Sequence, residues 1–185
     1  MEENPERNIV NKVVVVTGSS RGIGANIVKT LAKKGYRVIL NYNKSENYAQ
    51  NVQKELINVD IFKADVSKKA EAVSLINFAI EKYGKIDVLI NNAGISQSKL
   101  FTDLTDEDWN NIINSNLNSA FFCSREAAKN MIHNKSGLII NISSIWGITG
   151  ASCEVAYSTS KAALNGFTKA LAKELGPSNI RVNAI

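Results

Sequence analysis

Four consecutive valines at residues 13–16 constrain the fold of this chain more than any other feature. The run is too short to cross a membrane, and Thr17 and Gly18 end it at once. A strand that is apolar on both faces is typical of the interior of a parallel sheet that helices cover on both sides. Residues 12–17 are therefore predicted to form a buried strand of such a sheet.

Strands and helices are predicted to alternate along the rest of the chain. Apolar residues recur with helical spacing at Ile23, Ile27 and Leu31, and Gly35 then supplies a common helix end. Further strands are predicted at residues 37–42, 60–63, 86–91, 137–142 and 180–185. Helices are predicted at residues 22–34, 46–57, 68–83, from Thr105, at 119–132 and up to Leu175. The helix from Thr105 begins with Thr-Asp-Glu-Asp, a start typical of a capping box with acids in the first turn. The alternation favours an α/β fold, a doubly wound parallel sheet of Rossmann-type topology, which binds ligands beyond the carboxyl ends of its strands.

The composition is that of one ordinary globular domain. The chain has 185 residues, of which 44% are hydrophobic and 21% charged, and no apolar run could span a membrane. We assign residues 9–185 to the domain and residues 1–8 to a disordered tail, because MEENPERN resembles neither a signal nor a transit peptide. The net charge of +5 could attract an acidic partner, but it fits solvated helix faces better. Basic and aromatic residues do not interleave, so nucleic-acid binding is not expected.

Few residues could bind a metal ion. Cys123 and Cys153 fit neither a disulfide framework nor a zinc-site spacing, and His133 is the only histidine. No metal site is expected, and the cysteine usage favours a reducing cytoplasm.

A glycine-rich turn joins the first strand to the first helix. Gly18, Gly22 and Gly24 allow a tight turn and a close approach of the backbone to a pyrophosphate at the helix N-terminus. The alternative is a turn needed only for packing. The turn residues assigned to the cofactor site are Gly18, Ser19, Ser20, Arg21, Gly22, Ile23 and Gly24.

The end of the second strand bears on the choice of cofactor. Dinucleotide folds usually place an acid there to hold the ribose 2′-hydroxyl of NAD. Residues 41–44 read Asn-Tyr-Asn-Lys and contain no acid, while Arg21 and Lys44 could face a 2′-phosphate. The sequence therefore predicts NADP (NADPH) as the cofactor, with Asn43 in its site, although Lys44 could also be an ordinary loop residue.

Polar and small residues follow three further predicted strands. They are Asp65 and Val66 after the third strand, Asn92, Ala93 and Gly94 after the fourth, and Ser143 and Ser144 after the fifth. All lie on the side of the sheet where such folds bind ligands, so Asp65, Val66, Asn92, Ala93 and Gly94 are assigned to the cofactor site. The alternative is that they are turn residues.

Tyr157 and Lys161 lie four residues apart on a predicted helix, so they share one face of it. A free phenol is a poor proton donor at neutral pH, and a nearby ammonium favours its phenolate form. The pair could therefore protonate a developing alkoxide. The alternative is that Lys161 only adds solubility.

Together these motifs resemble the short-chain dehydrogenase/reductase family over essentially the whole chain. The matching motifs are the turn at residues 17–24, the Asn-Asn-Ala-Gly of residues 91–94, Asn116 before Leu117, Ser144, and Tyr157-x-x-x-Lys161.

The resemblance implies an NADPH-dependent reduction of a ketone to a secondary alcohol. Ser144 would hydrogen-bond the carbonyl, and Tyr157 would give the proton. Lys161 would also bind the ribose of the cofactor, and Tyr157 would lie against the cofactor. Asn116 would hold a water that links Lys161 to solvent. These four are the expected catalytic residues.

Within the family, the chain is most similar to 3-oxoacyl-carrier-protein reductases, whose substrate is bound to an acidic carrier protein. Residues 145–147 and 150–154 are more similar to reductases of a 5-aminopentanone group on elongation factor P. Carrier docking in the family uses a basic pair, whose positions here are Lys135 and Ser178. The substrate is thus expected to be a small-molecule or carrier-bound ketone, with a homodimer or homotetramer as the assembly; the alternative is that one subunit covers all of its own helix faces.

Two other classes are less favoured. A cofactor-sensing, non-catalytic protein would more often lack Tyr157 or Lys161, and an epimerase or dehydratase would have GxxGxxG glycine spacing. Family chains also continue beyond a sixth strand into substrate-covering helices and a seventh strand. We therefore expect a chain truncated at its C-terminus, marginally folded and inactive by itself, with the activity expected here belonging to the full-length protein.

Overall fold

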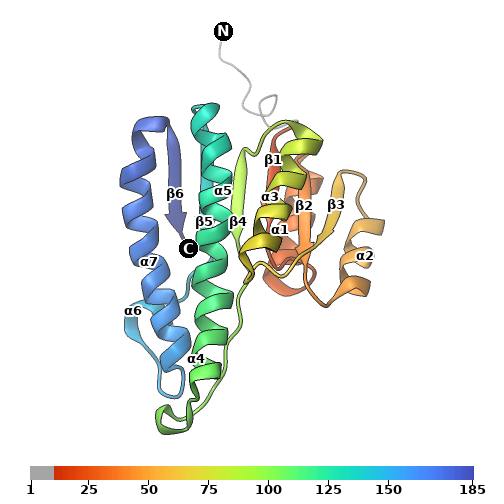
Figure 1. Cartoon of the computed structure of the whole chain (residues 1–185). Helices are drawn as coiled ribbons and strands as arrows, with labels where there is room; N and C mark the ends of the chain where they lie inside the picture. The colour runs from red at the N-terminus through yellow and green to blue at the C-terminus, as the bar shows by residue number, and fades with distance from the viewer. Residues whose placement is uncertain (1–10) are drawn as a thin grey trace.

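The computed structural model describes residues 11–185 and shows a six-stranded sheet between layers of helices (Figure 1). All strand pairs are parallel, and the strand order is β3-β2-β1-β4-β5-β6. The predicted doubly wound, Rossmann-type sheet is therefore confirmed. The strands are β1 (Val13–Val16), β2 (Arg37–Tyr42), β3 (Val59–Lys63), β4 (Val88–Asn91), β5 (Gly137–Asn141) and β6 (Ile180–Ala184). The tail predicted at residues 1–8 lies outside the described residues.

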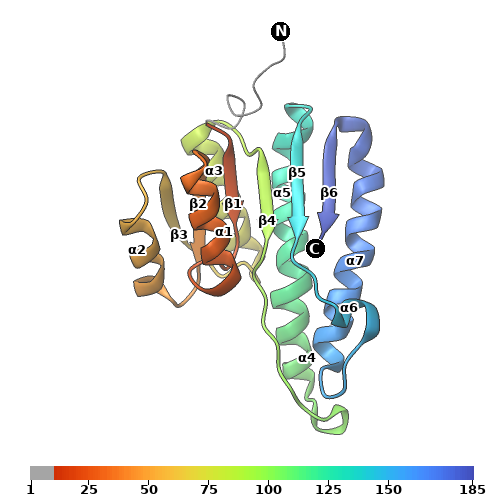
Figure 2. The ribbon, with the colours of Figure 1, turned by 180° about the vertical axis from the view of Figure 1, so that it is seen from behind.

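The valine run packs on both faces of the sheet. Val14 and Val16 contact the side covered by α1 (Gly22–Lys33) and α2 (Glu46–Lys54). Val13 and Val15 pack into the other layer, and none of the four is more than 1% exposed. That layer contains α3 (Lys69–Tyr83), α5 (Ser119–His133) and α7 (Val155–Leu175), as the two opposite views show (Figures 1 and 2). Two-sided burial thus explains why this strand needs four apolar residues in a row.

A π-helical turn separates the two helices that follow β4. The helix α4 (Asp106–Ile113) starts at Thr105, whose side chain and that of Asp108 form the predicted capping box. The turn η3 (Asn114–Asn118) then leads directly into α5. It contains Asn116, which is 1% exposed. Such turns are rare and often lie at functional sites, and periodicity alone did not indicate this one.

Some predicted bounds differ from the structure, and the strand predicted at residues 86–91 begins only at Val88. The helix predicted at residues 46–57 ends at Lys54, because the amide of Asn58 donates to the carbonyl of Ala32 at 2.9 Å and so requires the chain to turn before β3. Short helical turns at η2 (Phe101–Asp103), α6 (Trp146–Thr149) and η4 (Gly176–Ser178) were also not predicted. They are too short for a periodic apolar pattern to reveal.

A buried polar chain fixes α7 against the middle of the sheet. Asn91 of β4 donates to Asn141 of β5 at 2.8 Å, and Asn141 donates to Thr168 of α7 at 2.8 Å. Asn91 also donates to Ser124 of α5 at 2.9 Å. Because buried amides need their partners, these bonds favour one placement of α7, the helix that carries Tyr157 and Lys161.

Candidate active site

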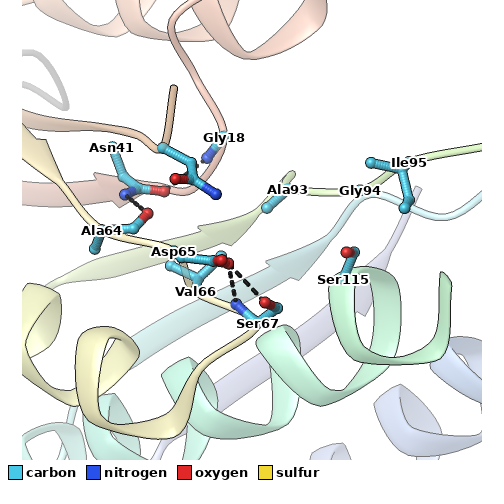
Figure 3. Close-up of a pocket in the computed structure, with 11 residues that line it drawn as sticks. Gly18, Asn41, Ala64, Asp65, Val66, Ser67, Ala93, Gly94, Ile95 and Ser115 are labelled. Atoms are coloured by element: carbon cyan, nitrogen blue, oxygen red, sulfur yellow. Dashed lines mark hydrogen bonds between the residues drawn. The ribbon is translucent and has the colours of Figure 1, made fainter. Parts of the chain in front are cut away.

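A pocket lies at the carboxyl ends of the strands and gathers residues that the sequence analysis had assigned separately (Figure 3). Its lining includes the assigned residues Gly18, Asn43, Asp65, Val66, Ala93 and Gly94. It also includes Asn41, Ala64, Ser67, Ile95 and Ser115, which the sequence analysis did not single out. The structure therefore brings the ends of β1, β2, β3 and β4 to one place.

The glycine turn is shaped for close approach. Gly18 and Gly22 both have φ of +58°, a conformation that side chains disfavour. A Cβ at Gly18 would lie 2.8 Å from the Cα of Ala93, and one at Gly24 would lie 2.7 Å from the Cα of Ser19. The turn can therefore pack tightly against the segment after β4 only with glycine at these positions.

The first turn of α1 is open to an anion. Arg21, the residue before the helix, makes no side-chain cap, so its exposed side chain does not satisfy the first N–H groups. The helix dipole adds positive potential there. Ile23 of this turn is 65% exposed, whereas Ser20 is 7% exposed. This end of α1 therefore has the open N–H groups that an anion needs, and a pyrophosphate there stays a prediction.

Some of the assigned residues support the turn through their side chains. The hydroxyl of Ser19 donates to the carbonyl of Val16 at 2.7 Å. The amide of Asn92 donates to the carbonyls of Thr17 and Gly18, both at 2.9 Å. The hydroxyl of Thr17, missed by the sequence analysis, accepts the N–H groups of Asn92 and Ala93, each at 3.0 Å. Only the fold reveals the roles of Thr17 and Asn92, since these two residues are 75 apart in the chain.

Lys161 is buried at the deep end of the site. It is 4% exposed, its Nζ donates to the carbonyl of Ile142 at 2.7 Å, and Nζ lies 5.6 Å from the centre of the Tyr157 ring. Burial lowers the pKa of Lys161 from 10.5 to about 8. A Cβ at Gly94 would lie 3.7 Å from this Nζ, so the ammonium faces the segment that lines the pocket. The solvated-lysine alternative is therefore wrong.

Asn116 is anchored by the same segment. Its Oδ1 accepts the N–H of Ile95 at 2.7 Å, and its Nδ2 donates to the carbonyl of Ile95 at 2.9 Å and to the hydroxyl of Ser160 at 3.0 Å. The side chain thus joins η3 to α7 and to the loop after β4. A Cβ at Gly94 would lie 3.1 Å from Oδ1, which places Asn116 next to Lys161.

Ser144 follows β5 and is held by α6. Its Oγ accepts the N–H of Trp146 at 3.2 Å, which leaves its O–H to donate to a ligand. The turn α6 packs closely on α7, because a Cβ at Gly147 would lie 2.8 Å from the carbonyl carbon of Lys161. The half-buried Tyr157 has no hydrogen-bond partner for its hydroxyl among residues 11–185. Both hydroxyls are therefore free to donate a hydrogen bond.

The cationic residues proposed for cofactor selection are exposed. Arg21 and Lys44 make no ion pair with any of residues 11–185, and Asn43 lines the pocket. The two positions that the resemblance assigns to carrier docking lie near each other, because the amide of Asn179, next to Ser178, donates to the carbonyl of Lys135 at 3.1 Å. Lys135 precedes β5 and Ser178 precedes β6. Both therefore lie at the amino ends of these strands, whereas Tyr157 follows the carboxyl end of β5.

Residues 11–185 contain no cluster of three or more His, Cys, Asp or Glu side chains that could hold a metal ion. Burial raises the pKa of the Cys123 thiol to about 12, so this cysteine stays protonated. Within the described part of the chain, no helix has the length and apolar character needed to cross a membrane.

Comparisons with known proteins agree with this geometry. The model of the short chain dehydrogenase family matches residues 12–185. An uncharacterised oxidoreductase of Bacillus subtilis, YmfI, is 41% identical over 181 residues, which are 95% of this chain and 74% of that protein. A 3-oxoacyl-[acyl-carrier-protein] reductase of Synechocystis is 40% identical over 94% of this chain and 72% of its own length. A crystal structure from Sinorhizobium meliloti, described as a short-chain alcohol dehydrogenase, aligns with a TM-score of 0.89 and 34% identity over 95% of this chain and 71% of that one.

The lowered pKa of Lys161 predicts a pH dependence of stability. Between pH 8 and 10.5 the unfolded chain binds more protons than the folded one at this residue, so the free energy of unfolding rises with pH there. Lys161→Met should remove that rise, while Lys169→Met, at an exposed position of the same helix, should keep it. Urea unfolding at several pH values measures the difference, and parallel curves for all three proteins would contradict it.

Proposed function

The chain belongs to the short-chain dehydrogenase family, and we propose that it reduces a ketone to a secondary alcohol with NADPH. The family is one of oxidoreductases that bind a nicotinamide dinucleotide. The observation that carries the proposal is the buried Lys161, whose Nζ lies 5.6 Å from the Tyr157 ring centre and next to Gly94, which lines the pocket. An ammonium buried beside a phenol suits proton transfer rather than solubility.

The reaction adds a hydride to the carbonyl carbon and a proton to its oxygen. The bound nicotinamide supplies the hydride. The O–H of Ser144 donates a hydrogen bond to the carbonyl oxygen, and Tyr157 gives its hydroxyl proton to the alkoxide that forms. The positive charge of Lys161 stabilises the phenolate that remains, and a pKa of about 8 lets the lysine exchange its own proton near neutral pH.

Asn116 supports this arrangement in two ways. Its side chain joins Ile95 to Ser160, and so holds the loop after β4 close to α7. A water held at η3 would link Lys161 to solvent and return the proton; this role remains a prediction from the family resemblance.

The preference for NADPH is proposed from charge. No acid ends β2, and the exposed Arg21 and Lys44 make no ion pair with residues 11–185. A 2′-phosphate would therefore meet these two exposed cations, while the nearby carboxylate of Glu46 interacts with the Tyr42 hydroxyl.

We expect NADPH to bind more tightly than NADH, and Asn43→Asp to reverse part of that preference. The new carboxylate repels the 2′-phosphate and accepts a hydrogen bond from a 2′-hydroxyl. Fluorescence titration with each reduced cofactor tests this, with Asn47→Asp on the exposed side of α2 as the charge control. Equal or tighter binding of NADH to the unmodified protein would contradict the proposal.

Two classes of ketone are proposed as the substrate. The relatives named as 3-oxoacyl-[acyl-carrier-protein] reductases favour a 3-oxoacyl thioester, and the exposed apolar side chains of Ile145 and Trp146 beside Ser144 suit an acyl chain. The second candidate is a ketone that carries an ammonium, as in the 5-aminopentanone group on elongation factor P. It is favoured by Glu154, three residues before Tyr157, because its Oε2 is buried without a hydrogen-bond partner among the described residues.

Glu154→Gln separates the two candidates. The change keeps the shape of the side chain but removes the charge that would pair with an ammonium. For an aminoketone, kcat/KM should fall by about tenfold or more, the effect of one charge-assisted hydrogen bond. For an acetoacetyl thioester it should change little. Steady-state rates with both substrates decide, and an equal effect on both would reject Glu154 as a selectivity residue.

Tyr157→Phe should separate proton transfer from cofactor binding. The ring and its packing remain, but the proposed proton donor is lost, so turnover should fall on the order of 10²–10⁴-fold. NADPH affinity should barely change. Lys161→Ala should reduce both turnover and NADPH affinity, because the ammonium also binds the ribose. A Lys161→Ala enzyme with a near-normal rate and affinity would reject the mechanism.

A further inference from the structure

Asn41, the fifth residue of β2, makes an unusual set of contacts at the floor of the pocket (Figure 3). The side chain is 1% exposed. Its Oδ1 accepts the N–H of Gly18 at 3.0 Å. Its Nδ2 points at three carbonyl oxygens, those of Ala64 at 3.0 Å, Phe62 at 3.3 Å and Tyr42 at 3.4 Å. One amide therefore joins the glycine turn after β1 to the segment after β3.

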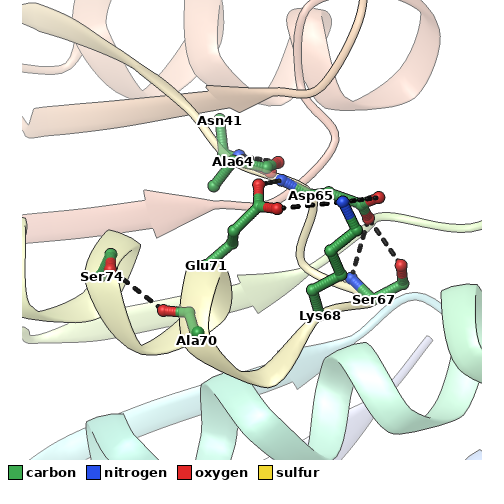
Figure 4. A network of polar contacts seen from close by, with 8 residues as sticks. All are labelled: Asn41, Ala64, Asp65, Ser67, Lys68, Ala70, Glu71 and Ser74. Atoms are coloured by element: carbon green, nitrogen blue, oxygen red, sulfur yellow. Dashed lines mark hydrogen bonds and ion pairs between the residues drawn. The ribbon is translucent and has the colours of Figure 1, made fainter.

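The segment after β3 is held from its other side as well (Figure 4). Ala64 and Asp65 share a peptide group whose carbonyl accepts from Asn41 and whose N–H donates to Oε2 of Glu71 at 2.7 Å. The carboxylate of Asp65 then accepts the N–H and the hydroxyl of Ser67, at 3.1 Å and 2.6 Å. This peptide can hardly rotate, so Asp65 and Val66 are fixed where they line the pocket.

We propose that Asn41 is a positioning residue for the cofactor, because it sets the spacing between the two walls of the nucleotide pocket. The inference rests on the proposed binding of NADPH. Asn41 touches the glycine turn and the Ala64–Asp65 peptide at once, and Gly18 and Ala64 both line the pocket. A shift of one wall would change the fit of a ligand that contacts both.

The chemistry of the amide explains why asparagine stands here. The position needs an acceptor for one N–H and a donor for carbonyl oxygens, in one plane and within one short side chain. Aspartate has the same shape but would set an acceptor against those carbonyls. It would push the end of β3 away from β2 while keeping its bond to Gly18.

Asn58 offers a matched control at the far end of the sheet. It directly precedes β3 and is partly buried. Its Nδ2 donates to the carbonyl of Ala32 at 2.9 Å and to that of Tyr36. It therefore makes the same type of bond, from the residue before β3 to α1 and to the residue before β2. None of its partners lines the pocket. Both Asn41 and Asn58 are expected to contribute to stability. Only Asn41 is expected to affect the geometry of the cofactor pocket as well.

The test compares Asn41→Asp with Asn58→Asp in the whole chain. Both variants should lower the thermal unfolding temperature. Asn41→Asp should also raise the Kd for NADPH at least about tenfold, the effect of one lost hydrogen bond, while Asn58→Asp leaves it within about twofold. At saturating NADPH, kcat of Asn41→Asp should stay within a few-fold of the unmodified enzyme, so the effect lies in KM for NADPH. Asn41→Ser supplies one hydroxyl, which can hydrogen-bond to fewer of the groups that Asn41 contacts, so its Kd for NADPH should be intermediate. This variant decides the question if Asn41→Asp does not fold.

The outcomes separate this inference from the proposed function. If the unmodified protein binds neither NADPH nor NADH, the proposed function fails. If it binds NADPH and the Asn41 variants bind it as tightly as Asn58→Asp does, the positioning role of Asn41 is overturned. Weaker binding in the Asn41 variants and in Asn58→Asp to the same degree would also overturn it, because general destabilisation would then explain the loss.

Discussion

Burial of β1 on both of its faces is the constraint on which the rest of this structure depends. Val14 and Val16 pack toward α1 and α2, and Val13 and Val15 pack toward α3 and α5. A strand with no solvent-facing side must lie in the middle of a sheet, and here it pairs with β2 on one side and β4 on the other. Because every pair is parallel, all carboxyl ends meet at one edge, where the glycine turn, Asp65, Gly94 and Ser144 come together.

One charged group of the site, the ammonium of Lys161, is buried away from water. Removing the ammonium of Lys161 from water is unfavourable, and its lowered pKa expresses this. The carbonyl of Ile142 partly offsets the loss, and the glycines at 94 and 147 leave room for the side chain and for α6 on α7. A lysine is therefore kept beside the Tyr157 ring, at some expense in stability below pH 8, where it is charged.

Side-chain amides form the framework around this site. Asn92 holds the glycine turn, Asn116 holds the loop after β4, and Asn41 joins the turn to the segment after β3. Asn41 and Asn116 use donors and an acceptor together, and Asn92 donates twice, which matches the mixed N–H and C=O groups that emerge where parallel strands end. Residues that the sequence suggests as ligand contacts can thus also be the supports of the pocket, and Asn92 is an example.

Local patterns in the sequence determined much of this protein. The valine run, the glycine turn, the Thr105 capping box and the four-residue spacing of Tyr157 and Lys161 depend on neighbours within a few residues, so they could be predicted directly. The π-helical turn at Asn116, the short helix α6 and the bonds of Asn41 could not. Asn41 and Ala64 are 23 residues apart, and Thr17 and Asn92 are 75 apart, so their contacts exist only once the sheet has brought the strand ends together. The burial that lowers the pKa of Lys161 is likewise a property of the packed helices, since an isolated helix would leave that ammonium in water.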